Sequence, residues 1–448
     1  MSKQPEQWAS KLGFILAAAG SAIGLGAIWK LPFTAGENGG GAFFLVFVLM
    51  LLFLGLPLLL AEFTIGRKTQ REAISAYRTL APDSNWHWIG KLGVGAAFLL
   101  LSFYSVVGGW IVIYLVQAIS GQFVGLDSEG FENMFAQVTQ NGWLVLTAHF
   151  VFMIMTILVV QGGIQKGIER STRWMMPTLF VLFIIIVIRS VTLDGAMEGI
   201  AFFFYPDFSN LDGQTILYAL GQAFFSLSLG ISVMVTYSSY LKKEEDLPRS
   251  AISIVSLTLF ISILAGLAIF PAVFSLGFEP TEGPPLIFIV LPAVFSEMVF
   301  GQLFFTLFII LLLFATLTSA FSLLEIVVAS VTKNNPEKRK KVAWICGLLI
   351  FTLGIPSALS EGILPTLPVI GMTFFGASDF LVSNILLPVG ALLIAIFTPL
   401  KIKKDDLFTE IQHGSSFKRR TFEIWYFLLK YIVPVAILLA FLNAIGII

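Results

Sequence analysis

Long apolar runs separated by short polar segments repeat along the whole chain. A membrane-spanning helix needs about 20 mainly apolar residues to cross about 30 Å of hydrocarbon, and eleven runs reach roughly this length. These runs cover about residues 11–35, 41–65, 92–120, 143–160, 174–193, 214–240, 250–276, 299–330, 342–358, 368–398 and 422–446. The pattern predicts an all-α polytopic membrane protein with eleven transmembrane helices. A shorter apolar stretch, Pro285 to Phe295, contains Pro292 and is expected to form a re-entrant or loop helix.

The amino-acid composition indicates a membrane protein and excludes several other classes of protein. Hydrophobic residues make up 57% of the 448 positions and charged residues 12%, whereas a soluble domain has about 25% charged residues. Lipid must therefore solvate most of the surface. The 27 Lys and Arg residues balance 27 Asp and Glu residues, which excludes a basic nucleic-acid binder. Cys346 is the only cysteine, which excludes a disulfide scaffold. We infer no obligate protein partner from the sequence.

The basic residues orient the predicted helices. The N-terminal segment and every second loop after it hold 24 of the 27 Lys and Arg residues, and the loops between them are mainly acidic. The positive-inside rule then places the N-terminus in the cytoplasm and, because the number of spans is odd, the C-terminus outside the cell. The polar loops are too short for a second domain, so residues 1–448 are expected to form one domain in the plasma membrane.

Two predicted spans contain sequences that disfavour a continuous helix. Gly20, Gly24 and Gly26 interrupt the first span, and Ser226-Leu-Ser-Leu-Gly230 follows Gly221 in the sixth. Each glycine costs a helix about 1 kcal/mol relative to alanine, and irregular backbone at mid-membrane depth is tolerated only where it lines a polar cavity. Broken helices expose carbonyls that hold a cation and N–H groups that hold a carboxylate. The pattern favours a transporter binding site; the alternative is that the glycines only allow close helix packing.

The two interruptions lie about 205 residues apart, which predicts an internal repeat. Five spans within residues 11–193 would form the first repeat and five within 214–398 the second, with the helix at 422–446 appended. Because five is odd, the second repeat would be inverted relative to the first.

Several motifs resemble the neurotransmitter:sodium symporter family, in particular its bacterial eleven-helix amino-acid transporters. They are Trp8-Ala-Ser-Lys-Leu-Gly13, Gly20-Ser-Ala-Ile-Gly-Leu-Gly26, Glu37-Asn-Gly-Gly-Gly-Ala-Phe43, Gly221-Gln-Ala-Phe-Phe-Ser-Leu-Ser-Leu-Gly230 with Tyr237 and Tyr240, Leu317-Thr-Ser319 and Ser383-Asn-Ile-Leu-Leu-Pro388. The match covers essentially the whole chain. It implies a symporter that imports its substrate together with Na⁺ by alternating access.

The resemblance implies one complete sodium site. Its ligands would be the carbonyls of Gly20, Ile23 and Ala315 and the hydroxyls of Thr318 and Ser319. Na⁺ is a hard cation that takes oxygen ligands, by the same logic that governs Ca²⁺ and Mg²⁺. Without the resemblance, the two hydroxyls would be expected to bond back to their own helix.

A second sodium site would use the Ala22 carbonyl, the Ser226 oxygens and the Thr258 hydroxyl. The family has asparagines at the positions of Ala27 and Thr258, so both amide ligands are missing and a single-sodium mechanism stays open. The chloride site of animal members is also incomplete. Gln222, Ser226 and Ser262 remain there, but Phe47 replaces a tyrosine, so a role for chloride stays open.

The substrate pocket of the family maps to small residues of the first span and to apolar or hydroxyl residues elsewhere. These are Ala22, Gly24, Leu25, Gly26, Leu100, Tyr104, Phe225, Ser226, Ser228, Ile231, Ser319 and Leu323. Gly24 stands where monoamine carriers have an aspartate, which leaves space for a substrate carboxylate near the Tyr104 hydroxyl. Because the remaining walls are apolar and uncharged, the resemblance implies a neutral, hydrophobic L-amino acid.

Ionisable residues inside a membrane are costly and are usually functional. The resemblance aligns Lys30, Gln222 and Asp379 with an extracellular gate, and lysine lacks the planar fork of the family's arginine, so the gate is expected to be looser. Glu62 resembles a glutamate that braces the unwound region. Glu325 is expected to face water at the cytoplasmic end of its span.

The cytoplasmic gate departs from the family pattern. Pro5 and Lys333 stand where the family pairs an arginine with an acid. Either another contact closes this side, for example one that involves Trp8, or the inward-open state is more populated than usual. The second is the hypothesis that the sequence favours.

Two other functions stay open. A sodium-independent exchanger of the same fold would explain Ala27 and Thr258, and a non-transporting sensor would bind an amino acid without moving it. An enzyme is not expected, because His87, His149 and His413 are scattered and no HExxH, GxSxG or Walker motif occurs.

Overall fold

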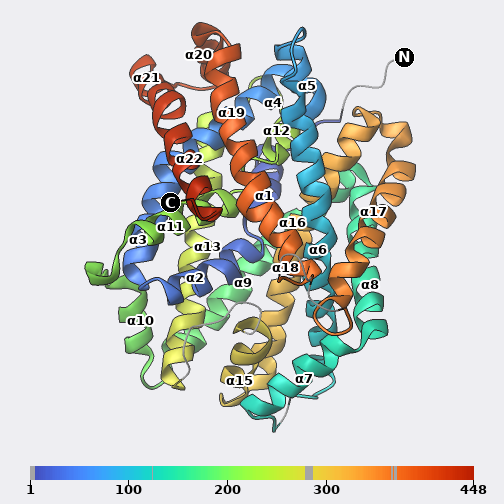
Figure 1. Ribbon diagram of the computed structural model, residues 1–448, viewed down its shortest axis with the longest axis vertical. Coiled ribbons are helices and arrows are strands. Elements are labelled where there is room, and N and C mark those ends of the chain that lie inside the picture. The colour runs from blue at the N-terminus through green and yellow to red at the C-terminus, as the bar shows by residue number, and fades with distance from the viewer. Residues whose placement is uncertain (1–5, 124, 278–285, 365–366, 368–370, 448) are drawn as a thin grey trace.

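The computed structural model describes residues 6–123, 125–277, 286–364, 367 and 371–447, and this part of the chain is almost entirely helical (Figure 1). Two isolated β-bridges, Gly40 with Pro206 and Leu367 with Met372, are the only extended pairings within these ranges. The predicted fold class, an all-α polytopic membrane protein, is confirmed.

The elements of the first half run from α1 to α12. They are α1 (Lys11–Ala22), η1 (Gly26–Lys30), α2 (Leu31–Glu37), α3 (Gly41–Met50), η2 (Leu51–Gly55), α4 (Leu56–Thr69), α5 (Ala73–Leu80), α6 (His87–Ile119), α7 (Ser128–Gln140), α8 (Gly142–Val160), η3 (Ile164–Glu169), α9 (Arg170–Val191), α10 (Ala196–Phe204), η4 (Phe208–Asn210), α11 (Gly213–Ser226) and α12 (Val233–Ser238).

The elements of the second half run from α13 to α22. They are α13 (Leu247–Ser275), η5 (Leu286–Val290), α15 (Leu291–Ser296), α16 (Gly301–Thr332), α17 (Pro336–Leu359), α18 (Phe374–Phe380), η6 (Leu381–Leu386), α19 (Leu387–Lys401), α20 (Lys404–Gln412), α21 (Arg419–Phe427), η7 (Leu428–Ile432) and α22 (Val433–Ala444).

The membrane spans agree with the predicted order. Within the described residues, 9 helical segments are long and apolar enough to cross a membrane, and the bent pair α1 and η1–α2 brings the number to 10. The predicted sixth span falls on α11 and α12, which are separated by Leu227 to Ser232 and are each too short to cross alone. A count of eleven therefore requires these two helices to form one broken span. The expected loop helix appears as a short apolar helix, Ile287–Ser296, and the predicted start of the tenth span at residue 368 lies outside the described residues.

The core lies around α6 and α16, which pass through the middle of Figure 1. Within their most apolar windows, 78% of the α6 residues and 83% of the α16 residues are buried, against 22% for the window in α21–α22. A segment with few buried residues, such as α21–α22, presents its apolar side chains to the outside of the bundle, as expected where lipid is the solvent. The residues of α6 and α16 are therefore the scaffold on which a site can be held rigidly.

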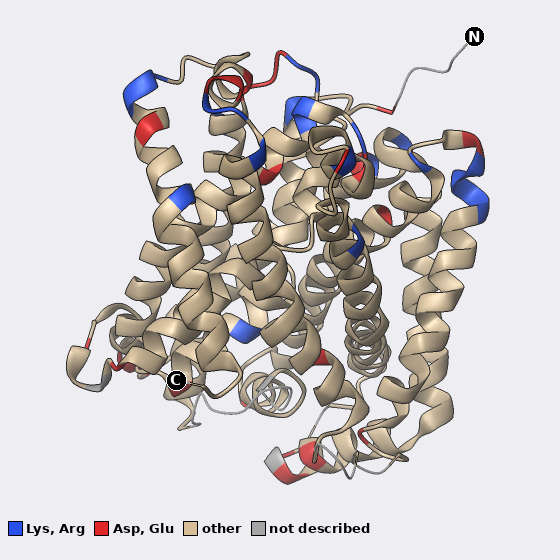
Figure 2. Ribbon diagram, turned by 45° about the horizontal axis from the view of Figure 1, so that its top comes forward, with Lys and Arg blue, Asp and Glu red and all other residues tan. Residues whose placement is uncertain are grey.

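Charge separates the two ends of the helix bundle. Figure 2 shows Lys and Arg gathered at one end, where α5, α20 and the start of α21 also lie in Figure 1. We call this the basic end and the other the opposite end. Acidic residues dominate the opposite end, where the loops next to α7 and α10 lie.

Candidate functional site

The first break separates α1 from η1 at Ile23 to Leu25, and the two halves of the span differ in direction by 53°. The glycines allow α16 and α11 to approach. A Cβ atom added to Gly20 would lie 3.0 Å from Thr318 Cβ, and one added to Gly24 would lie 2.3 Å from Ser319 Oγ. Close packing and an interrupted helix, which the sequence presented as alternatives, therefore occur together.

The second break lies between α11 and α12. Ser228, Gly230 and Ser232 have positive φ angles of 52°, 88° and 57°, a conformation that costs a residue with a side chain free energy unless its surroundings hold it. The Gly230 N–H donates a 2.9 Å hydrogen bond to Glu62 Oε1, and Glu62 is fully buried. This is the contact that the resemblance implied for Glu62.

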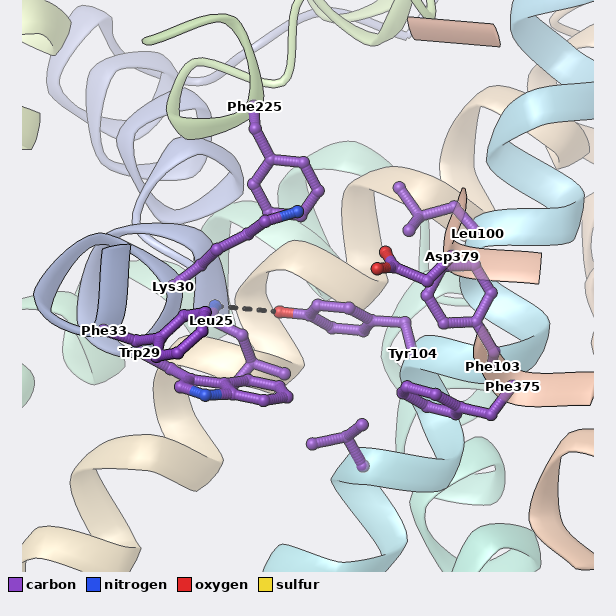
Figure 3. A pocket seen from close by; sticks show the side chains of 11 residues that line it. Leu25, Trp29, Lys30, Phe33, Leu100, Phe103, Tyr104, Phe225, Phe375 and Asp379 are labelled. Atoms are coloured by element: carbon purple, nitrogen blue, oxygen red, sulfur yellow. Dashed lines mark hydrogen bonds between the residues drawn. The ribbon is translucent and has the colours of Figure 1, made fainter. Parts of the chain in front are cut away.

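A central cavity lies between the two breaks. It is lined by eleven of the twelve predicted substrate residues, with Ser226 as the exception, and also by Ser21, Ser322 and Leu387. Among the residues that the structure describes, the Tyr104 phenol is the only ionisable side chain that lines it. The Tyr104 hydroxyl accepts a 3.3 Å hydrogen bond from the Leu25 N–H (Figure 3).

A cluster of serine hydroxyls forms the floor of the central cavity. Ser21 Oγ and Ser322 Oγ are 2.7 Å apart, and Ser228 Oγ donates to the Ser21 carbonyl at 3.0 Å. Ser21 and Ser322 were not predicted. The spacing on α16 could have indicated Ser322, because it lies one turn beyond Ser319 and so shares its face.

Four of the five residues predicted for the first ion site are joined by hydrogen bonds. We call these four residues the Thr318 set: Gly20, Ala315, Thr318 and Ser319. Thr318 Oγ1 donates to the carbonyls of Gly20 and Ala315, each at 3.0 Å, and Ser319 Oγ donates to the Gly20 carbonyl at 3.1 Å. Ile23, the fifth residue, follows α1 directly, but its carbonyl bonds to none of these hydroxyls in the described part of the chain. The Thr318 set therefore links the broken helix to α16 through oxygen atoms.

These oxygen atoms suit a hard monovalent cation. All four groups are neutral carbonyls or hydroxyls, and a hydroxyl proton rotates to whichever acceptor is available. If a cation takes the carbonyl lone pairs, both hydroxyls can turn their own lone pairs toward it. Among the described residues, no group of three His, Cys, Asp or Glu side chains is placed to hold a metal ion.

The second predicted ion site is not assembled in the same way. We call Ala22, Ser226 and Thr258 the Ser226 set. Ser226 Oγ accepts a 3.2 Å hydrogen bond from Gln222 Nε2 on its own helix, and Thr258 Oγ1 donates at 3.0 Å to the Ile254 carbonyl within α13. No hydrogen bond joins members of the Ser226 set to one another in the described ranges.

A second cavity of about 170 Å³, the outer cavity, lies beside the central one (Figure 3). The two share Leu25, Leu100, Tyr104 and Phe225. Aromatic side chains that were not predicted line much of the outer cavity, namely Trp29, Phe33, Phe103 and Phe375. A single sequence did not indicate them, because aromatic residues are frequent throughout this chain.

Two of the three predicted gate residues, Lys30 and Asp379, line the outer cavity, and they form no ion pair with each other. Lys30 Nζ lies 4.6 Å from the centroid of the Phe225 ring (Figure 3). Asp379 Oδ1 accepts a 2.8 Å hydrogen bond from Ser383. Gln222 Nε2 donates at 2.6 Å to the Gly26 carbonyl. These contacts join η1 to α11, so the two broken spans are connected on this side of the central cavity.

The basic end is closed by Trp8 and by buried charges. The Trp8 indole is 4% exposed and donates a 2.9 Å hydrogen bond to the Tyr237 carbonyl. The expectation that Glu325 faces water is wrong: Glu325 is fully buried, accepts a 2.7 Å bond from the Tyr240 hydroxyl and forms an ion pair with Arg339. Pro5, which replaces the family's arginine, lies outside the described residues.

Two broken helices with a cavity between them are the arrangement found at the binding sites of secondary transporters. The model of the sodium:neurotransmitter symporter family matches residues 5–127 and 128–447. The chain therefore belongs to this family, which consists of sodium-dependent transporters and not enzymes.

Two relatives and one solved structure resemble the chain over almost its full length. The sodium-dependent transporter YhdH of Bacillus subtilis is 57% identical over 448 residues, with 100% of this chain and 99% of the relative covered. A sodium-dependent transporter of Haemophilus influenzae is 36% identical over 99% of this chain and 98% of its own. The crystal structure of MhsT in complex with L-phenylalanine aligns with a TM-score of 0.91 and 45% identity, covering 98% of this chain and 100% of MhsT.

Proposed function

We propose that this protein imports a neutral, hydrophobic L-amino acid by sodium-coupled alternating access. The observation that carries the proposal is the central cavity, which joins two broken helices and is lined by small, apolar and hydroxyl-bearing residues. The walls that the central and outer cavities share, Leu25, Leu100, Tyr104 and Phe225, are apolar or aromatic, and such walls favour a hydrophobic substrate side chain. The similarity to MhsT, whose structure contains L-phenylalanine, supports the same substrate class.

The two ends of the amino-acid backbone have separate partners in this proposal. The carboxylate would take the Leu25 N–H and the Tyr104 hydroxyl, which now bond to each other at 3.3 Å. Gly24 leaves the space beside them, because any Cβ there would lie 2.8 Å from the Tyr104 hydroxyl oxygen. The ammonium group would take carbonyls freed by the breaks and the serine hydroxyls of the floor, all of which can accept hydrogen bonds.

The substrate side chain needs more room than the central cavity offers. That cavity measures about 30 Å³, enough for a water molecule but not for an amino acid. The outer cavity measures about 170 Å³, and an engineered protein cavity of about 150 Å³ binds benzene. Since Phe225 lines both cavities, rotation of its ring would join them into one site of suitable size.

One sodium ion is the proposed stoichiometry. The Thr318 set lies between the broken helix and α16, so an ion bound there stabilises one arrangement of these helices over others, which is the thermodynamic requirement for coupling. The Ser226 set has its hydroxyls engaged within their own helices. A role for chloride is not part of the proposal.

The basic end is assigned to the cytoplasm of a plasma membrane, because positively charged loops are retained on that side. The outer cavity then opens toward the outside, and Trp8 closes the inside. Two inverted repeats over residues 11–193 and 214–398, with an added helix at 422–446, form one domain. The amino acid, Na⁺ and lipid are its proposed partners.

Uptake into proteoliposomes tests the proposal. A labelled mixture of neutral amino acids should accumulate with an inward Na⁺ gradient and not with an equal choline gradient. Equal uptake in choline would support a sodium-independent exchanger instead, and saturable binding without any uptake would support a sensor.

A matched pair of variants tests the placement of the substrate. Tyr104→Phe should weaken binding about tenfold or more, since a hydrogen bond to a charged group is worth about 1.5–3 kcal/mol. Tyr205→Phe, at a tyrosine that is 74% exposed, should leave it unchanged. Equal affinities for both variants would place the carboxylate elsewhere.

A further inference from the structure

A surface groove lies at the basic end, where α6 begins after α5 and faces α19 (Figure 1). It measures about 410 Å³, more than twice the volume of an engineered cavity of about 150 Å³ that binds benzene. Indole rings and apolar side chains form most of its wall, namely Trp86, Trp88, Ile89, Leu92 and Leu393. Among the described residues, it shares no lining residue with the central or the outer cavity. The groove is therefore a separate place for a ligand.

Lys91 adds a positive charge to this groove. Its Nζ lies 3.9 Å from the centroid of the Trp88 ring, and no carboxylate forms an ion pair with it in the described part of the chain. The Trp88 side chain is 59% exposed, so the attraction between the ammonium group and the indole face holds the charge at the mouth of the groove without burying it. The Lys91 charge is therefore available to an anionic group of a ligand.

Gly95 extends the hollow along α6, away from the basic end. Trp88, Lys91, Leu92 and Gly95 share one face of the helix because they are three or four positions apart, and Gly95 lies about 10 Å beyond Trp88 along the helix axis. A Cβ atom added to the exposed Gly95 would meet no atom within 4 Å. A glycine inside a helix destabilises it relative to alanine, and no neighbouring protein atom requires one here. The missing side chain leaves a furrow on the outside of the bundle.

We propose that the groove binds an anionic phospholipid of the cytoplasmic leaflet, with its phosphate at Lys91 and one acyl chain along Leu92 and Gly95. The chemistry along α6 changes in the order that a phospholipid requires. A positive charge and indole rings lie at the depth of the headgroups, and apolar side chains and the furrow follow at the depth of the acyl chains. This site goes beyond the proposed transport function, because its ligand is not transported.

Native mass spectrometry of the purified protein in detergent tests the headgroup contact. Phosphatidylglycerol should bind about fivefold more tightly than phosphatidylcholine with the same acyl chains, since one basic residue near a membrane surface attracts anionic lipid by about this factor. Lys91→Gln should remove the preference. Lys338→Gln, at an exposed lysine of α17 that is also at the basic end, should keep it. An unchanged preference in Lys91→Gln would overturn the proposal.

A glycine substitution tests the acyl-chain contact in the same assay. Gly95→Leu fills the furrow and should weaken the binding of both lipids about threefold or more, while the preference for phosphatidylglycerol remains. Gly213→Leu is the matched control, because an added Cβ at this exposed first residue of α11 also meets no atom within 4 Å. Both side chains point into open space, so neither variant should disturb folding. Equal lipid affinities of the two variants would contradict the placement of the chain.

Fluorescence quenching tests the site in a bilayer. Phosphatidylglycerol brominated near the top of its chains, as a minor component of phosphatidylcholine vesicles, should quench tryptophan fluorescence more than an equal fraction of brominated phosphatidylcholine, because a bound lipid lies beside Trp86 and Trp88. Lys91→Gln should abolish the difference and Lys338→Gln should not. Equal quenching by both lipids in the parent protein would overturn the proposal. Displacement of phosphatidylglycerol by glycerol 3-phosphate would also overturn it, since the groove would then be a site for soluble phosphate esters.

Discussion

Two sets of oxygen atoms flank the broken helices, and they are organised differently. The hydroxyls of the Thr318 set cross from α16 to the carbonyl of Gly20 on α1 at 3.0 and 3.1 Å. The hydroxyls of the Ser226 set stay on their own helices, where Thr258 bonds to Ile254 and Ser226 to Gln222. A cation at the first set replaces the bonds between α16 and α1 as well as the bond of Thr318 to Ala315, whereas a cation at the second set replaces only bonds within a helix.

Serine and threonine residues have different hydrogen-bond partners in the two sets because their helices have different neighbours. Serine and threonine hydroxyls in a helix bond back to the preceding turn by default. Such a hydroxyl can instead bond to a carbonyl of a neighbouring helix, if that carbonyl has no partner in its own helix. The end of α1 at Ala22 leaves carbonyls of this kind. The break that frees the Gly20 carbonyl therefore lies in a different helix from the one that carries the Thr318 and Ser319 hydroxyls.

The largest expected effect is that of Thr318→Ala. It removes a ligand of the complete site, and a hydrogen-bond partner of a charged group is worth about 1.5–3 kcal/mol, so half-maximal uptake should need about ten- to hundredfold more Na⁺. Sodium titration of uptake measures this. Thr156→Ala is the control, because Thr156 is fully buried and donates at 3.0 Å within its own helix. An unchanged sodium requirement would mean that the Thr318 set does not couple transport.

The next effect comes from restoring the two missing amides. Ala27→Asn combined with Thr258→Asn should add two carbonyl ligands to the Ser226 set and raise the Hill coefficient for Na⁺ from about one toward two. Both positions are fully buried, so substrate binding is measured alongside to verify folding. A Hill coefficient near two in the unmodified protein would instead show that the Ser226 set already binds an ion.

A smaller effect is expected for Ser226→Ala. The Ser226 hydroxyl accepts from Gln222, which keeps its 2.6 Å bond to Gly26 after the change. Loss of one neutral hydrogen bond costs about 0.5–1.5 kcal/mol, so substrate affinity should fall about two- to tenfold while the sodium requirement stays the same. Ser250→Ala serves as the control, because the Ser250 hydroxyl is buried and has no hydrogen-bond partner within the described residues. A shift in sodium dependence would give Ser226 a direct role in ion binding.

The smallest effect is expected for Thr258→Val. The hydroxyl bonds only within α13, and the substitution keeps the branched shape. Uptake and sodium affinity should change less than about twofold. A loss comparable with that of Thr318→Ala would remove the distinction between the two sets.

Much of the architecture could be predicted from local sequence. Hydropathy located ten of the eleven expected spans, and the glycines near residues 20–26 and the serines near 226–230 located both breaks. The resemblance added most residues of the central cavity, because motifs around a break keep their spacing. The spans and the breaks depend on residues that are close to one another along the chain, within about one helical turn, and a single sequence shows these residues directly.

Other parts of the site depended on segments far apart in the chain. Glu6 and Arg339, which form an ion pair, are 333 residues apart, and Glu325 was expected to face water until α17 placed a guanidinium group beside it. Lys30 and Asp379 were aligned with the extracellular gate, and only the packing shows that Lys30 lies over Phe225 and that Asp379 accepts from Ser383.

By itself, the sequence determined that the chain crosses a membrane, where its helices break and which oxygen-bearing residues are available. The tertiary structure decided which hydroxyl meets which carbonyl, which charges pair and which end is closed. Hydropathy and helix propensity are properties of short stretches of sequence, so they can be read without knowing which helices pack together. Ion pairs and ligand sets require atoms within about 3 Å across different helices, and only the packing of the whole bundle determines those distances.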